Sequence, residues 1–297
     1  MSACCDYEGS DYRVRFWQNA DRAYEDAVER VALRRLLPSS GKRLIELGAG
    51  FGRLADLYAG YEEVVLLDYA RSMLHDAIAR WGSDPRFRFV VADVYRLPFA
   101  AGAFDAATMI RVVHHLADVP AALEQIRRVL AEGGTFVLEF ANKRNLKAML
   151  RHALRRQPWS PYTPEPVEFV ALHFDFHPRW MQLQAQQAGF VVQSALPVSF
   201  LRLNLLKRIL PLSLMVSLDA MLQRAGQRAL FAPSVFLSLR AGVRQPAARL
   251  PPCESIFRSP ISGAPVRREG DWLISDQDKV RWRVEGALYD FKSPEPL

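Results

Sequence analysis

The most constraining stretch of this 297-residue chain is a glycine-rich turn that follows a short apolar run. The run, over residues 44–47, ends in three glycines at every second position: Gly48, Gly50 and Gly52. A helical pattern starts at Arg53. A buried parallel strand, a tight turn and a helix N-terminus give this pattern. Because glycine tolerates positive φ and lets a ligand approach the backbone, the turn predicts a binding loop whose amides hold a polar or anionic group.

The spacing of the glycines separates two kinds of ligand. Dinucleotide-binding turns read G-x-G-x-x-G and face a pyrophosphate, whereas this turn reads G-x-G-x-G and follows an acid, Glu46. Since like charges repel, Glu46 suits a cationic ligand better. The stretch E-L-G-A-G-F-G resembles the first motif of class I S-adenosylmethionine (SAM) methyltransferases. The resemblance implies that Glu46, Gly48, Ala49, Gly50 and Gly52 bind SAM; a nucleotide-binding Rossmann domain is the alternative interpretation of the turn.

Strand and helix patterns alternate after the turn. We expect strands over residues 43–46, 63–67, 87–92, 104–110, 135–140, 191–200 and 234–239. Helices are expected over residues 52–58, 71–80, 120–130 and 178–188. Such alternation predicts a parallel sheet with helices on both faces and ligands at the carboxyl ends of its strands. The expected fold is therefore α/β, a Rossmann-like doubly wound sheet of seven mostly parallel strands.

Asp68 closes the second expected strand, 20 residues after Gly48. A carboxylate there can accept hydrogen bonds from both ribose hydroxyls. The Rossmann and methyltransferase interpretations both predict this role, and a helix cap is the structural alternative. Tyr69 and Met73 follow closely and are further candidates for the adenosine site, with core packing as the alternative for Met73.

Asp93 closes the third expected strand and separates the two interpretations. It lies in F-V-V-A-D-V-Y-R-L-P-F-A-A-G-A-F-D, residues 89–105, which resembles the corresponding methyltransferase segment. The L-P-F and F-D pairs in it are similar to those of small-molecule methyltransferases related to the quinone C-methylating enzymes. The resemblance implies that Asp93 accepts a hydrogen bond from the adenine amino group and that the amide of Val94 meets the ring.

The fourth expected strand runs into M-I-R-V-V-H-H-L. In the methyltransferase family this place meets the SAM amino group and presents the substrate to the methyl. The resemblance implies cofactor contacts at Ile110 and Arg111 and candidate catalytic residues at His114 and His115. Histidine titrates near neutral pH and can deprotonate a hydroxyl nucleophile. Packing between strand and helix is the alternative role for the two histidines.

Residues 142–178 break the α/β pattern and are expected to form a lid over the substrate. The segment starts with basic residues interleaved with Leu146, Leu150 and Leu154, the pattern of an amphipathic helix. The candidate substrate residues in the lid are Trp159, Tyr162, Phe174 and His177. The set His173, Asp175 and His177 lacks a further ligand in sequence reach, so we expect no metal.

Two other segments extend the expected methyltransferase domain, residues 43–244. Residues 1–42 form an N-terminal cap region with a helix over 19–37, from which Tyr12 and Trp17 cover the substrate or pack on the helix. Residues 201–230 are more apolar than one helix face requires. Packing on the sheet, a homodimer surface and peripheral membrane contact are the three interpretations of this insert.

The C-terminal segment, residues 253–297, follows a linker over 245–252 and resembles a small zinc ribbon that has lost its cysteines. The ligand positions hold Ser259, Ser262, Ser275 and Asp278. Serine is a poor substitute for thiolate in binding zinc. A unit this small is barely stable alone, so we expect it to dock on the main domain.

Bulk properties limit the partners and the compartment. The net charge of +7 favours acidic partners, either nucleic acid or an anionic membrane surface. Three cysteines give no disulfide framework and predict a reducing, cytoplasmic setting. The N-terminus has no visible secretory signal, and no uninterrupted apolar run is long enough for a membrane span.

The sequence therefore predicts SAM-dependent methyl transfer to a hydrophobic or aromatic small molecule, on oxygen, carbon or nitrogen, by in-line attack on the SAM methyl. An RNA or protein methyltransferase is one alternative, suggested by the positive charge and the ribbon-like tail. Against it, the chain has no N-P-P-Y type motif and no interleaved stacking aromatics, so nucleic acid is the weaker expectation. A non-catalytic SAM-binding or scaffolding protein is the second alternative.

Overall fold

The structure is a computed structural model that describes residues 8–9, 22–243 and 256–297. The predictions for Tyr12, Trp17 and the linker over 245–252 fall outside these residues. Among the described residues, no helix is both long enough and apolar enough to cross a membrane.

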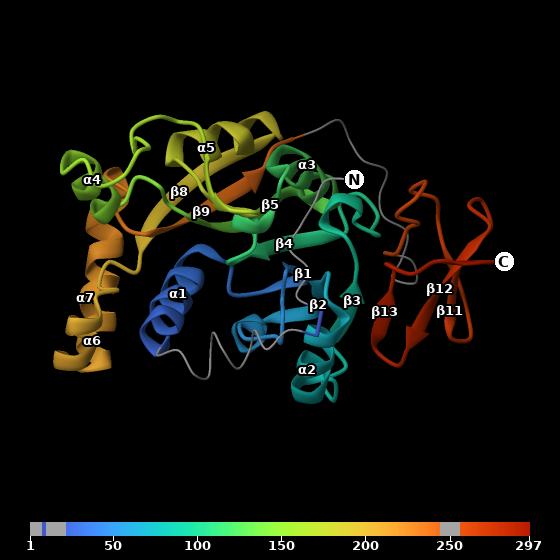
Figure 1. The fold of residues 1–297 in the computed structure, drawn as a ribbon. Coiled ribbons are helices and arrows are strands. Elements are labelled where there is room, and N and C mark those ends of the chain that lie inside the picture. The colour runs from blue at the N-terminus through green and yellow to red at the C-terminus, as the bar shows by residue number, and fades with distance from the viewer. Residues whose placement is uncertain (1–7, 10–21, 244–255) are drawn as a thin grey trace.

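Seven strands form the core of the sheet (Figure 1). They are β1 (Gly41–Leu47), β2 (Tyr61–Asp68), β3 (Phe87–Val91), β4 (Phe104–Met109), β5 (Leu130–Ala141), β8 (Phe190–Val198) and β9 (Ser234–Ala241). Their order is β3-β2-β1-β4-β5-β9-β8. The first five run parallel, and β9 is antiparallel to both β5 and β8. The predicted α/β, Rossmann-like fold is confirmed.

Helices cover both faces of this sheet (Figure 1). One apolar cluster includes side chains of α3 (Val119–Val129) and α5 (Pro178–Gln187). The other includes side chains of α1 (Ala23–Leu36), α2 (Arg71–Trp81) and α7 (Leu212–Ala225). Successive side chains of a strand point alternately into the two clusters, so the central strands are apolar on both faces.

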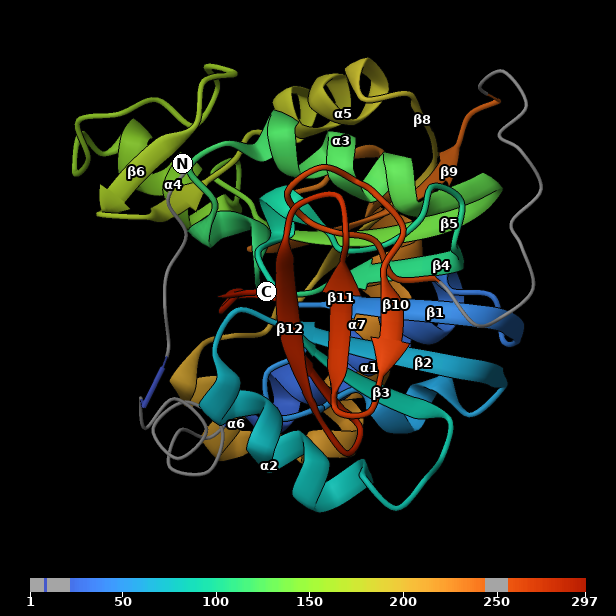
Figure 2. The ribbon, with the colours of Figure 1, turned by 90° about the vertical axis from the view of Figure 1, so that its right-hand side faces the viewer.

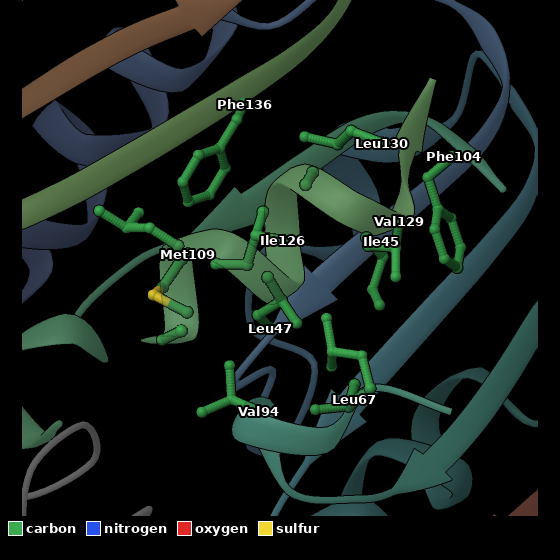
Figure 3. Packing of buried hydrophobic residues seen from close by; sticks show 14 of the residues in the cluster. Ile45, Leu47, Leu67, Val94, Phe104, Met109, Ile126, Val129, Leu130 and Phe136 are labelled. Carbon is green, nitrogen blue, oxygen red and sulfur yellow. The ribbon is translucent and has the colours of Figure 1, made fainter. Parts of the chain in front are cut away.

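The alternation is clearest on β1, where Leu44 belongs to the second cluster and Ile45 and Leu47 to the first. Figure 3 shows Ile126 and Val129 of α3 among the side chains of the first cluster. All five are almost fully buried. This double-sided core fixes the carboxyl ends of the strands, where the glycine turn begins.

The helix predicted over residues 52–58 is wrong. The chain forms turns after β1 and then only a short 3-10 helix, η2 (Ala55–Tyr58). Gly52, with a φ of +68°, lies outside the helical region and cannot belong to the predicted helix. Two further 3-10 helices, η3 (Val94–Arg96) and η4 (Val113–His115), follow β3 and β4, and η5 (Gly226–Arg228) follows α7.

Residues 142–178, which were predicted to form a lid and are called the lid below, contain α4 (Leu146–Ala153) and a two-stranded ribbon of β6 (Val167–Val170) and β7 (His173–Asp175). The insert after β8 contains α6 (Asn204–Ile209) and α7. The buried Asp219 of α7 accepts a hydrogen bond from the hydroxyl of Tyr24 of α1 at 2.6 Å. The insert therefore packs on α1 through α7, while α6 buries no residue fully.

The C-terminal strands continue the central sheet beyond β3 (Figure 1). They are β10 (Arg267–Glu269), β11 (Trp272–Ser275), β12 (Val280–Glu285), β13 (Leu288–Asp290) and β14 (Glu295–Pro296). Of these, β10, β11 and β12 run across the direction of the main strands (Figure 2). β13 pairs in parallel with β3, which would otherwise be an edge strand. The result is one continuous sheet of 12 strands, larger than the seven-stranded core.

Aromatic side chains join this C-terminal unit to the main domain. The ring of Phe257 lies 5.7 Å from Phe99, 4.6 Å from Tyr289 and 5.4 Å from Phe291, measured between centroids. Trp282 is buried beside Phe291. Since these rings belong to the same apolar cluster as the sheet, the unit shares the core of the main domain.

Candidate cofactor and substrate site

The glycine turn is shaped by contacts that exclude side chains. Gly48, Gly50 and Gly52 have φ values of +70°, +54° and +68°. A Cβ atom on Gly48 would lie 2.2 Å from Cγ2 of Val112. The amides of Gly48 and Ala49 both donate to the carbonyl of Leu67, at 2.8 and 2.9 Å. The turn is thus fastened to the end of β2, and its remaining backbone faces a pocket.

That pocket lies between the glycine turn and the residues that follow β4. Its lining consists of Glu46, Gly48, Ala49, Gly50, Phe51, Arg53, Leu54, Ile110 and Arg111. Six of these residues were predicted from the sequence to bind the cofactor, and the structure brings them together. Phe51, Arg53 and Leu54 were missed, although they belong to the same motif.

Glu46 is the buried acid of this pocket. Its Oε2 atom has no hydrogen-bond partner among the residues that the structure describes. Burial raises the pKa of Glu46 to about 8, although the guanidinium of Arg53 acts against the shift. An unsatisfied carboxyl oxygen beside open backbone is costly unless something occupies the pocket. A positively charged ligand would satisfy it and favour its ionised form.

Asp68 connects the glycine turn to the strand beside it. Its Oδ2 accepts from the amide of Gly50 at 2.7 Å, and its Oδ1 accepts from the amide of Ala70 at 2.9 Å. Each carboxylate oxygen can accept more than one hydrogen bond. Met73 places its Cε 3.4 Å from where a Cβ of Gly50 would be, so it lies over the turn. The structure therefore gathers Gly50, Asp68 and Met73 at one place.

Asp93 lies at the neighbouring strand end. The amide of Ala92 donates to the carbonyl of Asp68 at 3.1 Å, so the ends of β2 and β3 are held together. One oxygen of Asp93 accepts from the amide of Tyr95 at 2.9 Å and caps η3. Val94 is nearly buried beneath it. The two predicted carboxylates thus occupy adjacent positions on the same edge of the sheet.

Tyr69 contacts the C-terminal unit. The ammonium of Lys292 lies 3.6 Å from the centre of the Tyr69 ring. Arg71, two residues further on, forms ion pairs with Glu285 and with Asp290, the latter at 2.9 Å. The segment that carries Asp68 is therefore held from outside by β12 and β13. None of the sequence motifs described above indicates these contacts.

A charged network that the sequence did not predict lies beyond Arg111. Its guanidinium pairs with Glu29 of α1, and its amide donates to Oε2 of Glu139 at 2.8 Å. Burial acts to raise the pKa of Glu29, but the guanidiniums of Arg111 and Arg53 hold it below its usual value. Burial raises the pKa of Glu139. Arg111 itself adopts a φ of +61°, a conformation uncommon for a non-glycine residue.

His114 and His115 do not titrate near neutral pH. Burial lowers the pKa of His115 to about 4 and that of His114 well below its usual value. Their rings lie 4.0 Å apart, and His173 of the lid meets His115 edge-on at 4.6 Å. Both rings are therefore neutral at pH 7 and can accept a proton only weakly. Burial thus moves the pKa of both rings away from the near-neutral value that an exposed histidine would have.

Asp175 of β7 is a further acid whose pKa is moved toward neutrality. Burial raises its pKa to about 6, with the guanidinium of Arg202 acting to lower it. Arg202 itself is partly buried, and its Nε has no hydrogen-bond partner within the described ranges. The sequence singled out Asp175 only as one member of a metal set, and it did not single out Arg202.

The four lid candidates divide into two groups. Trp159 and Phe174 are partly buried, and Phe174 stacks on Phe176 at 6.1 Å. Tyr162 is exposed, and His177 is buried, where its Nδ1 accepts from the amide of Arg179 and caps α5. Burial lowers the pKa of His177 to about 4.

Comparison with known proteins agrees with the geometry of the turn. A family model described as a methyltransferase domain matches residues 45–138. Over these residues, about a third of the chain, the sequence is similar to that of a methyltransferase domain. Such domains depend on SAM, and the match runs from β1 to β5, through the glycine turn and both carboxylates. The predicted cofactor, SAM, is the one that this domain implies.

Curated relatives of the methyltransferase domain include enzymes of quinone biosynthesis. The chain is 43% identical over 111 residues to the demethylmenaquinone methyltransferase of Thermus thermophilus, across 35% of this chain and 50% of the relative. It is 33% identical over 131 residues to the ubiquinone/menaquinone biosynthesis C-methyltransferase of Dinoroseobacter shibae, across 42% and 51%. The chain therefore spans about half the length of the relatives it matches.

Solved structures share the fold of the domain at lower identity. One chain of the complex between the Haloferax volcanii Trm112 methyltransferase activator and a methyltransferase superposes with a TM-score of 0.54 and 20% identity. The match covers 78% of this chain and 95% of that one. A SAM-dependent methyltransferase from Mesorhizobium loti gives 0.53 and 21%, over 73% and 99%.

Proposed function

We propose that the protein transfers the methyl group of SAM to a hydrophobic or aromatic small molecule. The observation that carries the proposal is the unsatisfied, buried carboxyl oxygen of Glu46 beside the glycine turn. A ligand with a positive charge and an amino acid end would suit that pocket, and Gly50 of its lining donates a hydrogen bond to Asp68. The curated relatives support small-molecule methyl transfer, since those named above act in quinone biosynthesis.

The cofactor would extend along the edge of the sheet. Its methionine part would lie against Glu46, Ala49 and the three glycines of the turn, with Ile110 and Arg111 at the amino end. Asp68 and Tyr69 would hold the ribose, and Asp93, Val94 and Met73 would hold the adenine. When bound, SAM supplies an electrophilic methyl, so the protein mainly has to align the acceptor and exclude water.

The acceptor would enter beneath the lid. Trp159 and Phe174 offer partly buried aromatic surface there. Tyr162 is exposed on the lid, and His177 is engaged in capping α5. Neutral His114 and His115 would orient an acceptor hydroxyl rather than remove its proton. Asp175, with a pKa of about 6, is ionised at pH 7 and is the stronger candidate base.

Calorimetric titration with S-adenosylhomocysteine tests the proposal. We expect binding by the wild-type protein and a loss of at least about 100-fold in affinity for Asp68→Ala, because two charged hydrogen bonds to ribose would disappear. Glu124→Ala, which removes an exposed carboxylate of α3, is the control and should bind normally. Normal affinity in Asp68→Ala, or binding of NADH instead, would refute the assignment. Transfer of a radiolabelled methyl group from SAM to an aromatic acceptor would then distinguish an enzyme from a SAM-binding scaffold.

We also infer that residues 253–297 are a zinc-ribbon unit without zinc. Three serines surround one carboxylate: the hydroxyls of Ser262 and Ser275 donate to Oδ2 of Asp278 at 2.8 and 2.6 Å. Hydrogen bonds from the hydroxyls of Ser259, Ser275 and Ser262 lower the pKa of Asp278. These are the four positions that the sequence aligned with zinc ligands. Within the described ranges, no three His, Cys, Asp or Glu side chains gather into a metal site.

A further inference from the structure

An exposed apolar stripe runs along α4. Leu146, Leu150 and Leu154 are 57%, 61% and 54% exposed, and their spacing of four residues puts them on one face. The helix is attached by its other face, where Ala148 is buried. Three neighbouring leucines in contact with water are unusual for a helix that covers nothing.

A second apolar group follows β8. Leu203, Leu205 and Ile209, at and before α6, are each about two-thirds exposed. Phe169 and Val170 of the lid strand β6 are also exposed. We call these five residues and the three leucines of α4 the apolar rim. Its members come from two segments that are far apart in the sequence.

Topology puts both segments at the same edge of the sheet. β5 and β8 run in the same direction, because each is antiparallel to β9. α4 begins after the carboxyl end of β5, and α6 begins after the carboxyl end of β8. This is also the edge where β1 and β4 end in the glycine turn and Arg111. In Figure 1, α4 and α6 both lie on the left-hand side of the molecule, with α4 above and α6 below.

Positive charge is concentrated on the same two segments. Residues 143–164 contain six basic and no acidic residues, and residues 201–218 contain three basic and no acidic residues. Together these charges exceed the net charge of the whole chain, +7, so the remainder is slightly acidic. Within the described part of the chain, no ion pair forms at the exposed side chains Lys147, Arg151, Arg155, Arg156 and Arg208.

We propose that the apolar rim is a docking surface for an anionic phospholipid bilayer. Exposed leucines that enter the headgroup region, flanked by lysines and arginines that meet lipid phosphates, are the two components of interfacial binding. A second copy of the chain fits less well, since a two-fold contact would bring the same positive side chains together. A nucleic acid would match the charge and leave the leucines without a partner.

Docking through the apolar rim would also determine which side of the molecule faces the membrane. The rim belongs to the lid and to the insert that border the carboxyl edge of the sheet, so docking would turn the candidate acceptor site toward the membrane. A hydrophobic acceptor could then reach it from lipid. This consequence rests on the proposed function, whereas docking itself does not.

Co-sedimentation of the full-length protein with vesicles tests the proposal. The probes are vesicles of phosphatidylcholine alone and of phosphatidylcholine with a quarter phosphatidylglycerol. We expect binding to the mixed vesicles, at least tenfold weaker binding to the neutral ones, and a marked decrease between about 0.1 and 0.5 M salt, since screening shortens the range of the attraction. Equal binding to both compositions, or to neither, overturns the proposal.

Matched variants separate the apolar and the charged contributions. The double variant Leu146→Asp with Leu150→Asp should lower binding to the mixed vesicles at least tenfold at low salt. The double variant Lys147→Glu with Arg151→Glu should also lower it at least tenfold, because each charge contributes roughly fivefold to the affinity. Val191→Asp, which alters a similarly exposed residue at the opposite edge of the sheet, and Arg268→Glu on β10 are the controls and should bind normally.

Two results contradict the proposal directly. Undiminished vesicle binding by the double leucine variant would mean attraction by charge alone, as a nucleic-acid surface would give. A wild-type dimer in light scattering that Leu150→Asp converts to a monomer would make the rim an interface between copies. Unchanged thermal unfolding of each variant checks that these exposed substitutions leave the fold intact. None of the measurements depends on methyl transfer, so failure of docking and failure of the proposed function are distinguishable.

Discussion

Glu46 couples the charge of the pocket to pH. The pKa of about 8 in the folded, ligand-free protein stands well above the ordinary value of 4.5. Between these two pH values the folded chain keeps a proton on Glu46 that the unfolded chain releases. The contribution of Glu46 to stability is therefore fully present below about pH 4.5 and is lost as pH rises through 8.

Ligand binding should reverse this protonation. A cationic ligand favours the carboxylate, so we expect SAM, whose sulfonium gives it a net positive charge, to release close to one proton at pH 6.5 and to bind more tightly as the pH rises toward 8. The slope would approach tenfold per pH unit. Calorimetry in two buffers of different ionisation enthalpy measures the released proton. Glu46→Gln should abolish both the release and the slope; a wild-type protein that releases none would contradict the account.

Gly48 is constrained by two separate effects. Its positive φ costs any other residue about 1–2 kcal/mol, and its missing Cβ leaves the space that Val112 fills at 2.2 Å. The glycine was predicted from the motif, but Val112 lies far along the chain and nothing local indicates the contact. The motif therefore identifies Gly48, but its contact with Val112 is visible only in the structure.

Gly48→Ala should therefore be more damaging than backbone strain alone explains. Gly102→Ala is the matched control, because Gly102 has a φ of +69° and its nearest atom to an added Cβ is 3.8 Å away. We expect the control to lower the free energy of unfolding by about 1 kcal/mol, and Gly48→Ala by about 1–3 kcal/mol more, from overpacking. Chemical denaturation of both variants measures the difference; equal losses would mean that Val112 moves away freely.

At the scale of elements, periodicity identified most of the core. The strands around the glycine turn and the helices over α2, α3 and α5 were expected within a few residues of their bounds, because their apolar positions follow simple repeats. In place of the helix predicted over 52–58 the chain forms only η2, and the positive φ of Gly52 accounts for the loss of the first residue alone. The pairing of β13 with β3 was missed because parallel pairing between distant segments leaves no local signal.

The serine cluster of the C-terminal unit is a further element-scale feature. Because its hydrogen bonds already hold together the four positions that the zinc-ribbon proposal aligns with ligands, placing cysteines there should create a metal site. We expect the variant with cysteine at Ser259, Ser262, Ser275 and Asp278 to bind one Zn²⁺ per chain in native mass spectrometry. It should also unfold at a higher temperature with zinc than with a chelator, since metal binding stabilises the folded state.

The wild-type protein is the comparison for this variant, and its unfolding temperature should not respond to zinc or to a chelator. A variant with cysteine at Ser275 and Asp278 only supplies two ligands and should bind zinc weakly. A four-cysteine protein that folds and takes up no zinc would reject the zinc-ribbon interpretation of these residues.

At the scale of the whole molecule, the continuous sheet links the C-terminal unit to the cofactor site. β13 covers the edge of β3, whose end carries Asp93, and Arg71 binds Glu285 and Asp290 from the segment that carries Asp68. The unit therefore contacts the two strand ends that we assign to the adenosine. Its small size would make it marginal alone, and sharing the aromatic core with the main domain resolves that difficulty.

If the C-terminal unit positions the adenosine site, loosening it should weaken cofactor binding while the pocket residues remain intact. We expect Glu285→Gln with Asp290→Asn to reduce the affinity for S-adenosylhomocysteine by up to about fivefold, because partly exposed ion pairs contribute about 1 kcal/mol or less. Glu295→Gln removes an exposed pair with Arg281 inside the same unit and is the control. Calorimetry on all three proteins measures the effect. An unchanged affinity in the double variant would mean that the unit stabilises the fold and does not position the cofactor, because Arg71 would then keep the Asp68 segment in place unaided.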